Sequence, residues 1–101
     1  MITVLAAIRV KAGRLSDFLE IFKANVPHVR KEKGCVEYFP AVDIDAGLPG
    51  QSSDEQVVTV VERWESLEAL RGHMGAPHML TYREKVKGLV EGISVKVLRE
   101  A

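Results

Sequence analysis

Apolar and polar positions alternate along four segments of this chain in a way that predicts four strands. Residues 2–10 and 57–64 are apolar on both alternate sets of positions and rich in β-branched residues, which is typical of strands covered on both faces. Residues 35–44 form another strand, and Pro40 places it at a sheet edge or a bulge because proline has no amide hydrogen. A last strand spans residues 93–98. The apolar residues on one of its faces are Ile93, Val95 and Val97.

Helical periodicity appears in the segments between these strands. Apolar residues recur at helical spacing over residues 15–30, with Ser16 as a possible N-cap and Gly34 as a stop signal. Ser66 is expected to cap a second, short helix because its hydroxyl can accept a free amide hydrogen of the first turn. The Gly75-Ala76-Pro77 run ends that helix and begins a third, since proline fits the first helical turn.

The predicted order of elements is β-α-β-β-α-α-β, the ferredoxin-like pattern of the α+β class. It gives a four-stranded antiparallel sheet whose central strands are the first and the third, with the helices on one face. The other face also carries apolar residues and therefore needs a cover, which a second copy of the chain would supply most simply. The positions on this face are Leu5, Ala7, Val57, Thr59, Val61 and Leu98, all apolar except Thr59. We therefore predict a homodimer packed sheet to sheet.

Composition limits the possible classes of protein. A length of 101 residues with 47% apolar content fits one domain over residues 1–101. The formal charge is zero, so attraction to nucleic acid or to anionic membranes is not expected. No apolar run is long enough to span a membrane, and a strand that begins at Ile2 leaves no room for a signal peptide, so a cytoplasmic protein is expected. Cys35 is the only cysteine, which excludes an internal disulfide and a cysteine-based metal cluster.

Four side chains that could carry chemistry are expected to gather near the end of the third strand. Glu62 and Trp64 are two residues apart and share a face of that strand. His73 and His78 are five residues apart across a helix break, so they do not form an i, i+4 metal pair, and no third ligand is evident. A histidine in an apolar pocket can act as a general base because its pKa lies near neutral pH. The simpler alternatives are a core position for Trp64 and surface or capping positions for the histidines.

At these residues the chain resembles the antibiotic biosynthesis monooxygenase family, especially its small bacterial quinol monooxygenases. The resembling segments are VLAAIRVKAGR, VPHVRKEKGCVEY, VVERWESLEALRGHMGAPHM and VLREA, which together reach nearly the whole length of the chain. The resemblance implies a dimeric ferredoxin-like α+β barrel that oxidises hydroquinones, phenols or anthrones with O2 and without metal, flavin or haem. A base and a dry cavity suit this chemistry, since a deprotonated phenol is a better electron donor. The implied partners are a small aromatic substrate, O2 and a second copy of the chain.

The resemblance also implies roles for individual residues. His73 or His78 would be the base, and Trp64 would form a wall of the cavity for the aromatic ring, with the carboxylate of Glu62 nearby. Tyr38 and Tyr82 would be hydroxyl partners of the substrate.

Two positions depart from relatives within the same family. Val60 stands where the polyketide-anthrone oxygenases carry an asparagine, and Ala6 stands where the haem-degrading relatives carry one. Ala6 would therefore contact the substrate without a hydrogen bond. The alternatives to a quinol monooxygenase are an isomerase of a small phosphorylated carbonyl compound, a haem-degrading enzyme, or a ligand-binding dimer without enzymatic activity.

Overall fold

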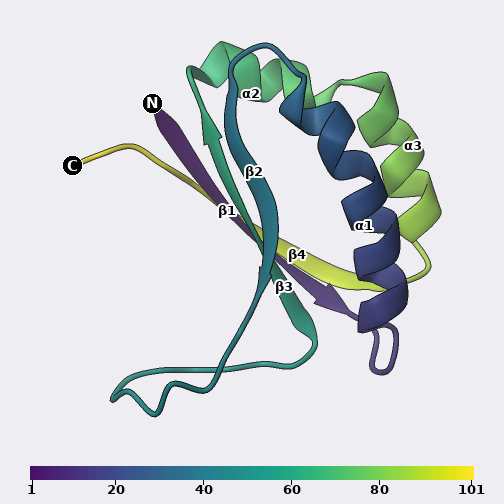
Figure 1. Ribbon diagram of the computed structural model, residues 1–101, viewed down its shortest axis with the longest axis vertical. Coiled ribbons are helices and arrows are strands. Elements are labelled where there is room, and N and C mark those ends of the chain that lie inside the picture. The colour runs from purple at the N-terminus through teal and green to yellow at the C-terminus, as the bar shows by residue number, and fades with distance from the viewer.

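Two long antiparallel strands form the centre of the sheet in the computed structural model, which describes residues 1–101 (Figure 1). β1 (Ile2–Val10) pairs with β3 (Val57–Trp64) on one side and with β4 (Val90–Leu98) on the other. β2 (Cys35–Val42) pairs with the outer side of β3, which gives the strand order β2-β3-β1-β4. The ferredoxin-like α+β fold and its predicted central pair are therefore confirmed, and β2 is the edge strand that Pro40 indicated.

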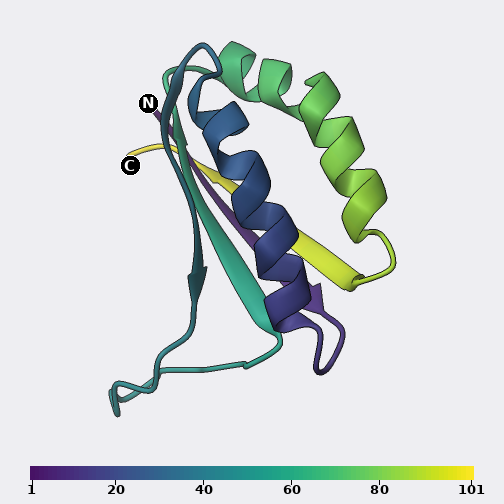
Figure 2. The same cartoon turned by 45° about the vertical axis from the view of Figure 1, so that its right-hand side comes forward.

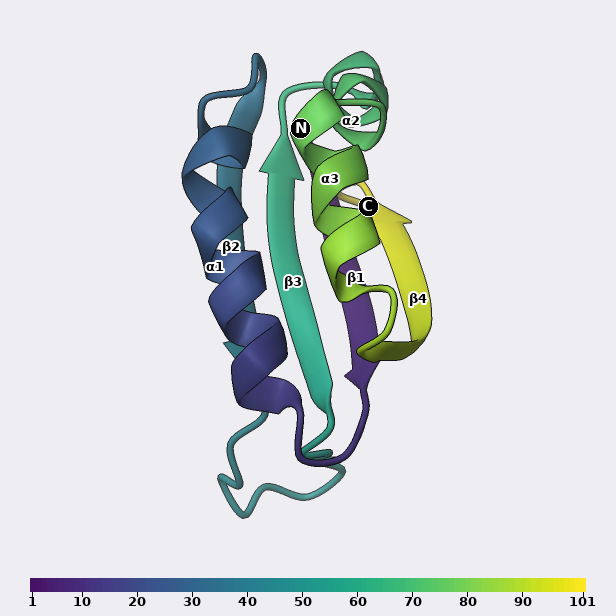
Figure 3. The same ribbon diagram turned by 90° about the vertical axis from the view of Figure 1, so that its right-hand side faces the viewer.

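Three helices lie on one face of this sheet: α1 (Leu15–Arg30), α2 (Leu67–Met74) and α3 (Pro77–Val86). α1 packs on β2, α3 packs against α1, and α2 covers the end of β3. Figure 2 shows the helices as one layer beside the sheet, and Figure 3 shows that β4 lies beside this layer rather than beneath it. The helix layer is therefore narrower than the sheet.

The core forms between the helix layer and the alternate residues of the two central strands. On β1 and β3 every second residue is buried, and on α1 and α3 the buried residues recur at helical spacing, as their sequence patterns predicted. The central part of this core consists of Val4, Ala6, Val58, Val60, Trp64, Phe18, Phe22, Val26, Met79 and Tyr82.

Of the two serine N-caps predicted from the sequence, one is confirmed and the other is wrong. The Ser66 hydroxyl accepts a hydrogen bond from the Ala69 amide at the start of α2, which confirms the predicted cap. The cap predicted at Ser16 is wrong, because α1 begins one residue earlier and Arg14 occupies the N-cap position. There the Arg14 guanidinium pairs with Asp17 in the first turn, and no side chain bonds to a free helix amide.

The second face of the sheet has no cover within the chain. Leu5, Ala7 and Val61 on this face are only half-buried, and Phe39 and Leu98 are exposed. None of the helices combines the length and apolar composition that a membrane-spanning helix needs. The apolar residues of this outer face are therefore available for contact with another protein surface.

Candidate active site

A cavity of about 580 Å³ lies between the sheet and the helix layer, within the volume range of small-molecule sites. Fifteen of the 19 residues that line it are hydrophobic, so only a few polar groups can orient a ligand. Its buried polar residues, Tyr38, Glu62, His73 and Tyr82, come from β2, β3, α2 and α3. The cavity therefore has the form of an apolar chamber with a small set of polar contacts.

The sheet register and the short α2 helix bring Glu62 and His73 together. Glu62 lies on the helix-facing side of β3, directly between Tyr38 of β2 and Val4 of β1. β3 ends at Trp64, and the cap at Ser66 starts α2 at once, so the chain folds back over the strand end. His73 lies in the last turn of α2, where its side chain is only 2% exposed.

The His73 imidazole lies between two carboxylates. Its Nδ1 atom is 2.8 Å from Oε2 of Glu32, and its Nε2 atom is 4.0 Å from Oε1 of Glu62. The ring packs against the indole of Trp64, with 4.7 Å between ring centroids, and meets the Tyr38 ring edge to face. When Nδ1 donates to Glu32, Nε2 holds the free lone pair. The ring is thus fixed in position with one nitrogen able to accept a proton.

Burial controls the protonation of these polar groups. Burial lowers the pKa of His73, and the hydrogen bond and charge of Glu32 only partly offset this effect, so the imidazole is neutral at neutral pH. Burial also raises the pKa of Glu62, against the opposing effect of its hydrogen bond from Trp64. The pKa values of the Tyr38 and Tyr82 hydroxyls are raised by burial as well, so both remain protonated donors.

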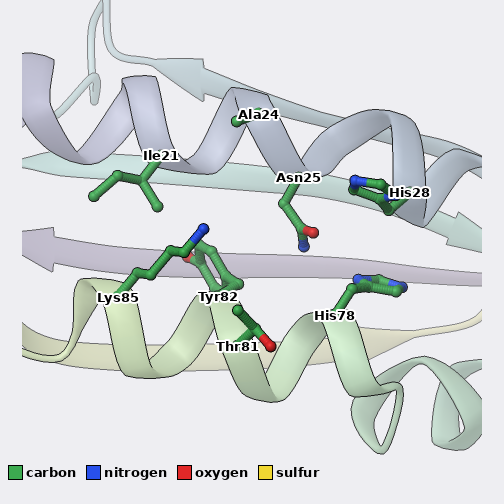
Figure 4. A pocket seen from close by; sticks show the side chains of 8 residues that line it. All are labelled: Ile21, Ala24, Asn25, His28, His78, Thr81, Tyr82 and Lys85. Carbon is green, nitrogen blue, oxygen red and sulfur yellow. The ribbon is translucent and has the colours of Figure 1, made fainter.

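His78, which the sequence offered as the alternative to His73 for the base, does not line this cavity. It faces a separate groove between α1 and α3, where its ring stacks on His28 with centroids 5.9 Å apart (Figure 4). Its Nε2 atom is 3.2 Å from the same Glu32 carboxylate that holds His73. The structure therefore places His73 in the cavity and His78 in a separate groove, with the Glu32 carboxylate in contact with both imidazoles.

The position of Trp64 as a wall of the cavity, which the family resemblance implied, is wrong, and the alternative of a core position is confirmed. Its side chain is fully buried in the core and is absent from the cavity lining, whereas Glu62 and His73, which both contact the indole, do line the cavity. The indole Nε1 atom donates a hydrogen bond of 2.9 Å to Oε1 of Glu62. Trp64 therefore supports the two polar groups, whereas Ala6 and both tyrosines do line the cavity.

Glu32 is the residue of this site that the sequence did not reveal. It lies in the turn between α1 and β2, far from His73 along the chain. The only available signal was topological, because this turn and the β3–α2 junction lie at the same end of the sheet, where Glu65 N donates to the Gly34 carbonyl. An acidic residue in that turn could have been considered for this reason.

A metal site and a phosphate-binding site have less support than a general base. No group of three or more His, Cys, Asp or Glu side chains is arranged to hold a metal ion. Arg9 and Arg63 pair with Asp54 and Glu37 through partly exposed side chains and do not line the cavity. Arg83 does line it, but its guanidinium donates a hydrogen bond to the Met74 carbonyl. The strongest arrangement for chemistry is therefore the imidazole between two carboxylates.

Comparison with known proteins assigns the chain to a family. A family model described as antibiotic biosynthesis monooxygenase matches residues 1–85. The chain belongs to the antibiotic biosynthesis monooxygenase family. Among its members, the "Probable quinol monooxygenase YgiN" of Escherichia coli K12 is 40% identical over an alignment 101 positions long, which covers 98% of this chain and 97% of the relative. The family resemblance of the sequence is thus confirmed.

Solved structures show the same fold as this antibiotic biosynthesis monooxygenase family member. A putative antibiotic biosynthesis monooxygenase from Nitrosomonas europaea superimposes with a TM-score of 0.84 at 18% identity, over 99% of this chain and 98% of that one. Rv0793 from Mycobacterium tuberculosis superimposes with a TM-score of 0.80 at 28% identity, over 99% and 94% of the two chains.

Replacing Glu62 with glutamine should raise stability at pH 8 in this family member. The folded state raises the pKa of Glu62, so it binds the proton more tightly than the unfolded chain does, and stability falls as the carboxyl ionises. Glutamine avoids that cost and still offers an oxygen to the Trp64 indole. We expect Tm to rise by a few degrees at pH 8, with a smaller difference at pH 4, in calorimetry. If the variant and the wild type had the same Tm at pH 8 and also at pH 4, the destabilising effect of a buried carboxylate would be contradicted.

Proposed function

We propose that this protein is a cofactor-independent monooxygenase that oxidises a hydroquinone or related phenol with O2, with His73 as the base. One observation carries the proposal: a buried, neutral imidazole, held by Glu32, reaches an apolar cavity in a member of the antibiotic biosynthesis monooxygenase family. The similarity to the E. coli relative, a probable quinol monooxygenase, supports a quinol as the substrate class.

The first step removes a proton from the substrate. A hydroquinone hydroxyl placed at Nε2 of His73 gives its proton to the imidazole, and the Glu32 carboxylate stabilises the imidazolium that forms. The protonated hydroxyls of Tyr38 and Tyr82 are available as donors to the resulting anion. The largely apolar lining offers few partners for water near His73, which favours electron transfer from the anion to O2 over return of a proton from solvent.

The remaining steps balance without an added reductant. O2 adds to a ring carbon of the hydroquinone anion, and the peroxide that forms takes the proton back from His73. The O–O bond then breaks, the same carbon loses its hydrogen, and water leaves. The products of one hydroquinone and one O2 are a hydroxyquinone and one water. His73 therefore returns to its neutral form at the end of each cycle.

Oxygen consumption tests this function. With menadiol as substrate, the purified protein should consume O2 well above the rate of autoxidation measured without protein. Equal rates with and without protein, across a series of hydroquinones, would contradict the proposal. Proton exchange in a carbonyl substrate without oxygen consumption would instead support an isomerase.

The pH dependence of the rate should depend on Glu32. In the wild-type protein, kcat/KM should fall as the pH decreases through the lowered pKa of His73, below about 6.5. Glu32→Gln removes the charge that raises this pKa, so the fall should move to lower pH. The variant should also lose up to about 100-fold in kcat, because the imidazole is less well oriented.

Glu65→Gln is the matched control for Glu32→Gln. It replaces an exposed carboxylate at the same end of the sheet that makes no ion pair with His73. Its pH profile should match that of the wild type. An unchanged profile in Glu32→Gln would show that Glu32 does not act on the base.

We also propose that the outer sheet face joins two copies of the chain. The half-buried apolar residues of β1 and β3 on this face support it, since an isolated chain leaves them partly in water. Light scattering at micromolar concentration should report twice the 11.2 kDa mass of one chain. Val61→Lys, which puts a charge at the centre of this face, should increase the monomer fraction. A wild-type monomer would contradict the dimer.

A further inference from the structure

The cavity continues beyond the edge of the helix layer onto β4. Three apolar residues of this strand, Ile93, Val95 and Val97, line the cavity and are nevertheless 64%, 52% and 50% exposed. They point to the helix-facing side of the sheet, because they pair with the buried residues Ile8, Ala6 and Val4 of β1. The open side of the candidate active site is therefore an apolar strip on an edge strand.

The sheet register makes this strip continuous with the polar end of the cavity. One row crosses the sheet from Glu62 through Val4 to Val97, and the next row runs from Val60 through Ala6 to Val95. Every residue in the two rows except Glu62 is apolar. Two strand spacings separate β3 from β4, a distance of about 10 Å. A ligand bound at Glu62 and His73 therefore has an apolar floor of this width beside it.

The cavity is also too large for a single aromatic ring. A cavity of about 150 Å³ in a protein core is enough to bind benzene, whereas this one has about 580 Å³. Nothing along the strip can hydrogen-bond to a ligand through its side chain, so the remaining space suits hydrocarbon. Water directly over the strip would lack polar partners there, since the other polar residues of the lining, Arg83 and Lys87, belong to α3 and its C-terminal end.

We propose that the substrate is a hydroquinone that carries an apolar side chain, with its ring at His73 and its chain across β1 onto Val95 and Ile93. This inference rests on the proposed function and names the substrate class for the same site. We assign the strip to binding of the substrate because it is continuous with the cavity. Burial of the substrate's apolar side chain then contributes to binding, while the ring alone takes part in the reaction.

Two changes test this inference: a series of substrates with alkyl chains of increasing length, and a polar substitution on β4. In a series of naphthohydroquinones with 2-alkyl chains from methyl to hexyl, KM should fall about fourfold per methylene buried, until the chain extends past β4. Val95→Thr keeps the side-chain volume and should weaken this dependence. Ser94→Ala is the matched control, because Ser94 is the next residue of the same strand and faces the outer side of the sheet. Calorimetric binding of the corresponding oxidised quinones measures the same dependence without turnover.

The outcomes separate this inference from the proposed function. A KM and a quinone Kd that do not change with chain length would overturn the inference, even if menadiol turnover remains dependent on His73. A Kd that falls with chain length without any turnover would support the strip and contradict the oxidation. If Val95→Thr changes the dimer mass in light scattering and leaves the chain-length dependence intact, a second copy covers β4 and the inference is overturned.

Discussion

Replacing His73 with glutamine is expected to reduce kcat for menadiol oxidation by a factor of about 100 to 10,000, the usual range for the loss of a general base. Glutamine keeps an amide that can bond to Glu32 and nearly fills the space of the ring, but it cannot accept the substrate proton. Oxygen uptake, corrected for autoxidation, measures the effect. The melting temperature, measured in parallel, separates lost chemistry from lost folding.

His78→Gln is the matched control for His73→Gln. His78 contacts the same Glu32 carboxylate but faces the groove between α1 and α3, outside the cavity (Figure 4). We therefore expect this variant to retain most of its activity. Equal losses in the two variants, or a larger loss for His78→Gln, would contradict the assignment of the base.

Gly34→Ala should be the most destabilising of the simple glycine substitutions in this chain. Gly34 has a φ angle of +83°, and a Cβ atom there would lie 2.5 Å from the Cβ of Ala69 in α2. The left-handed backbone costs about 1–2 kcal/mol for alanine, and the overlap adds about 1–3 kcal/mol. For a domain of this size, Tm should fall by roughly 10–20 °C in thermal unfolding. Activity should also decrease, because α2 carries His73.

Gly13→Ala is the control for backbone strain alone. Gly13 has a similar φ angle of +78°, but nothing lies within 4 Å of the added Cβ atom. Its Tm should fall by less than half as much. In the double variant Gly34→Ala/Ala69→Gly the overlap is removed, so part of the loss should be recovered after allowance for a glycine in a helix, about 1 kcal/mol. Equal effects at Gly13 and Gly34 would contradict the proposed clash.

The fold could be predicted from the sequence because its elements carry strong patterns. The alternation along β1 and β3 identified the central strands, and Ser66 and Pro77 marked helix ends that the structure confirms. Ser16 failed as a cap because α1 begins one residue earlier, with an ion pair of Arg14 in its first turn. The N-cap thus lies two residues before the predicted one, at Arg14, and this shift depends on side-chain pairing that a periodic pattern does not record.

The candidate site could be predicted only in outline. The sequence placed Glu62, Trp64 and the two histidines near the end of one strand, but it could not determine which histidine faced inward. α2 is eight residues long, so its rotation about its own axis is set by packing rather than by its apolar pattern. Glu32 carried no pattern at all, since it belongs to a turn whose position relative to α2 exists only in the folded chain.

The contact between the indole and the imidazole gives the protein a built-in optical probe. Trp64 is the only tryptophan of the chain, and no other aromatic ring lies in such close contact with His73. A positively charged imidazole quenches the fluorescence of an adjacent indole, whereas a neutral one does so much less. In the Glu62→Gln variant, where the carboxyl bonded to the indole no longer titrates, emission recorded against pH therefore follows the charge of this histidine before any substrate or oxygen is added.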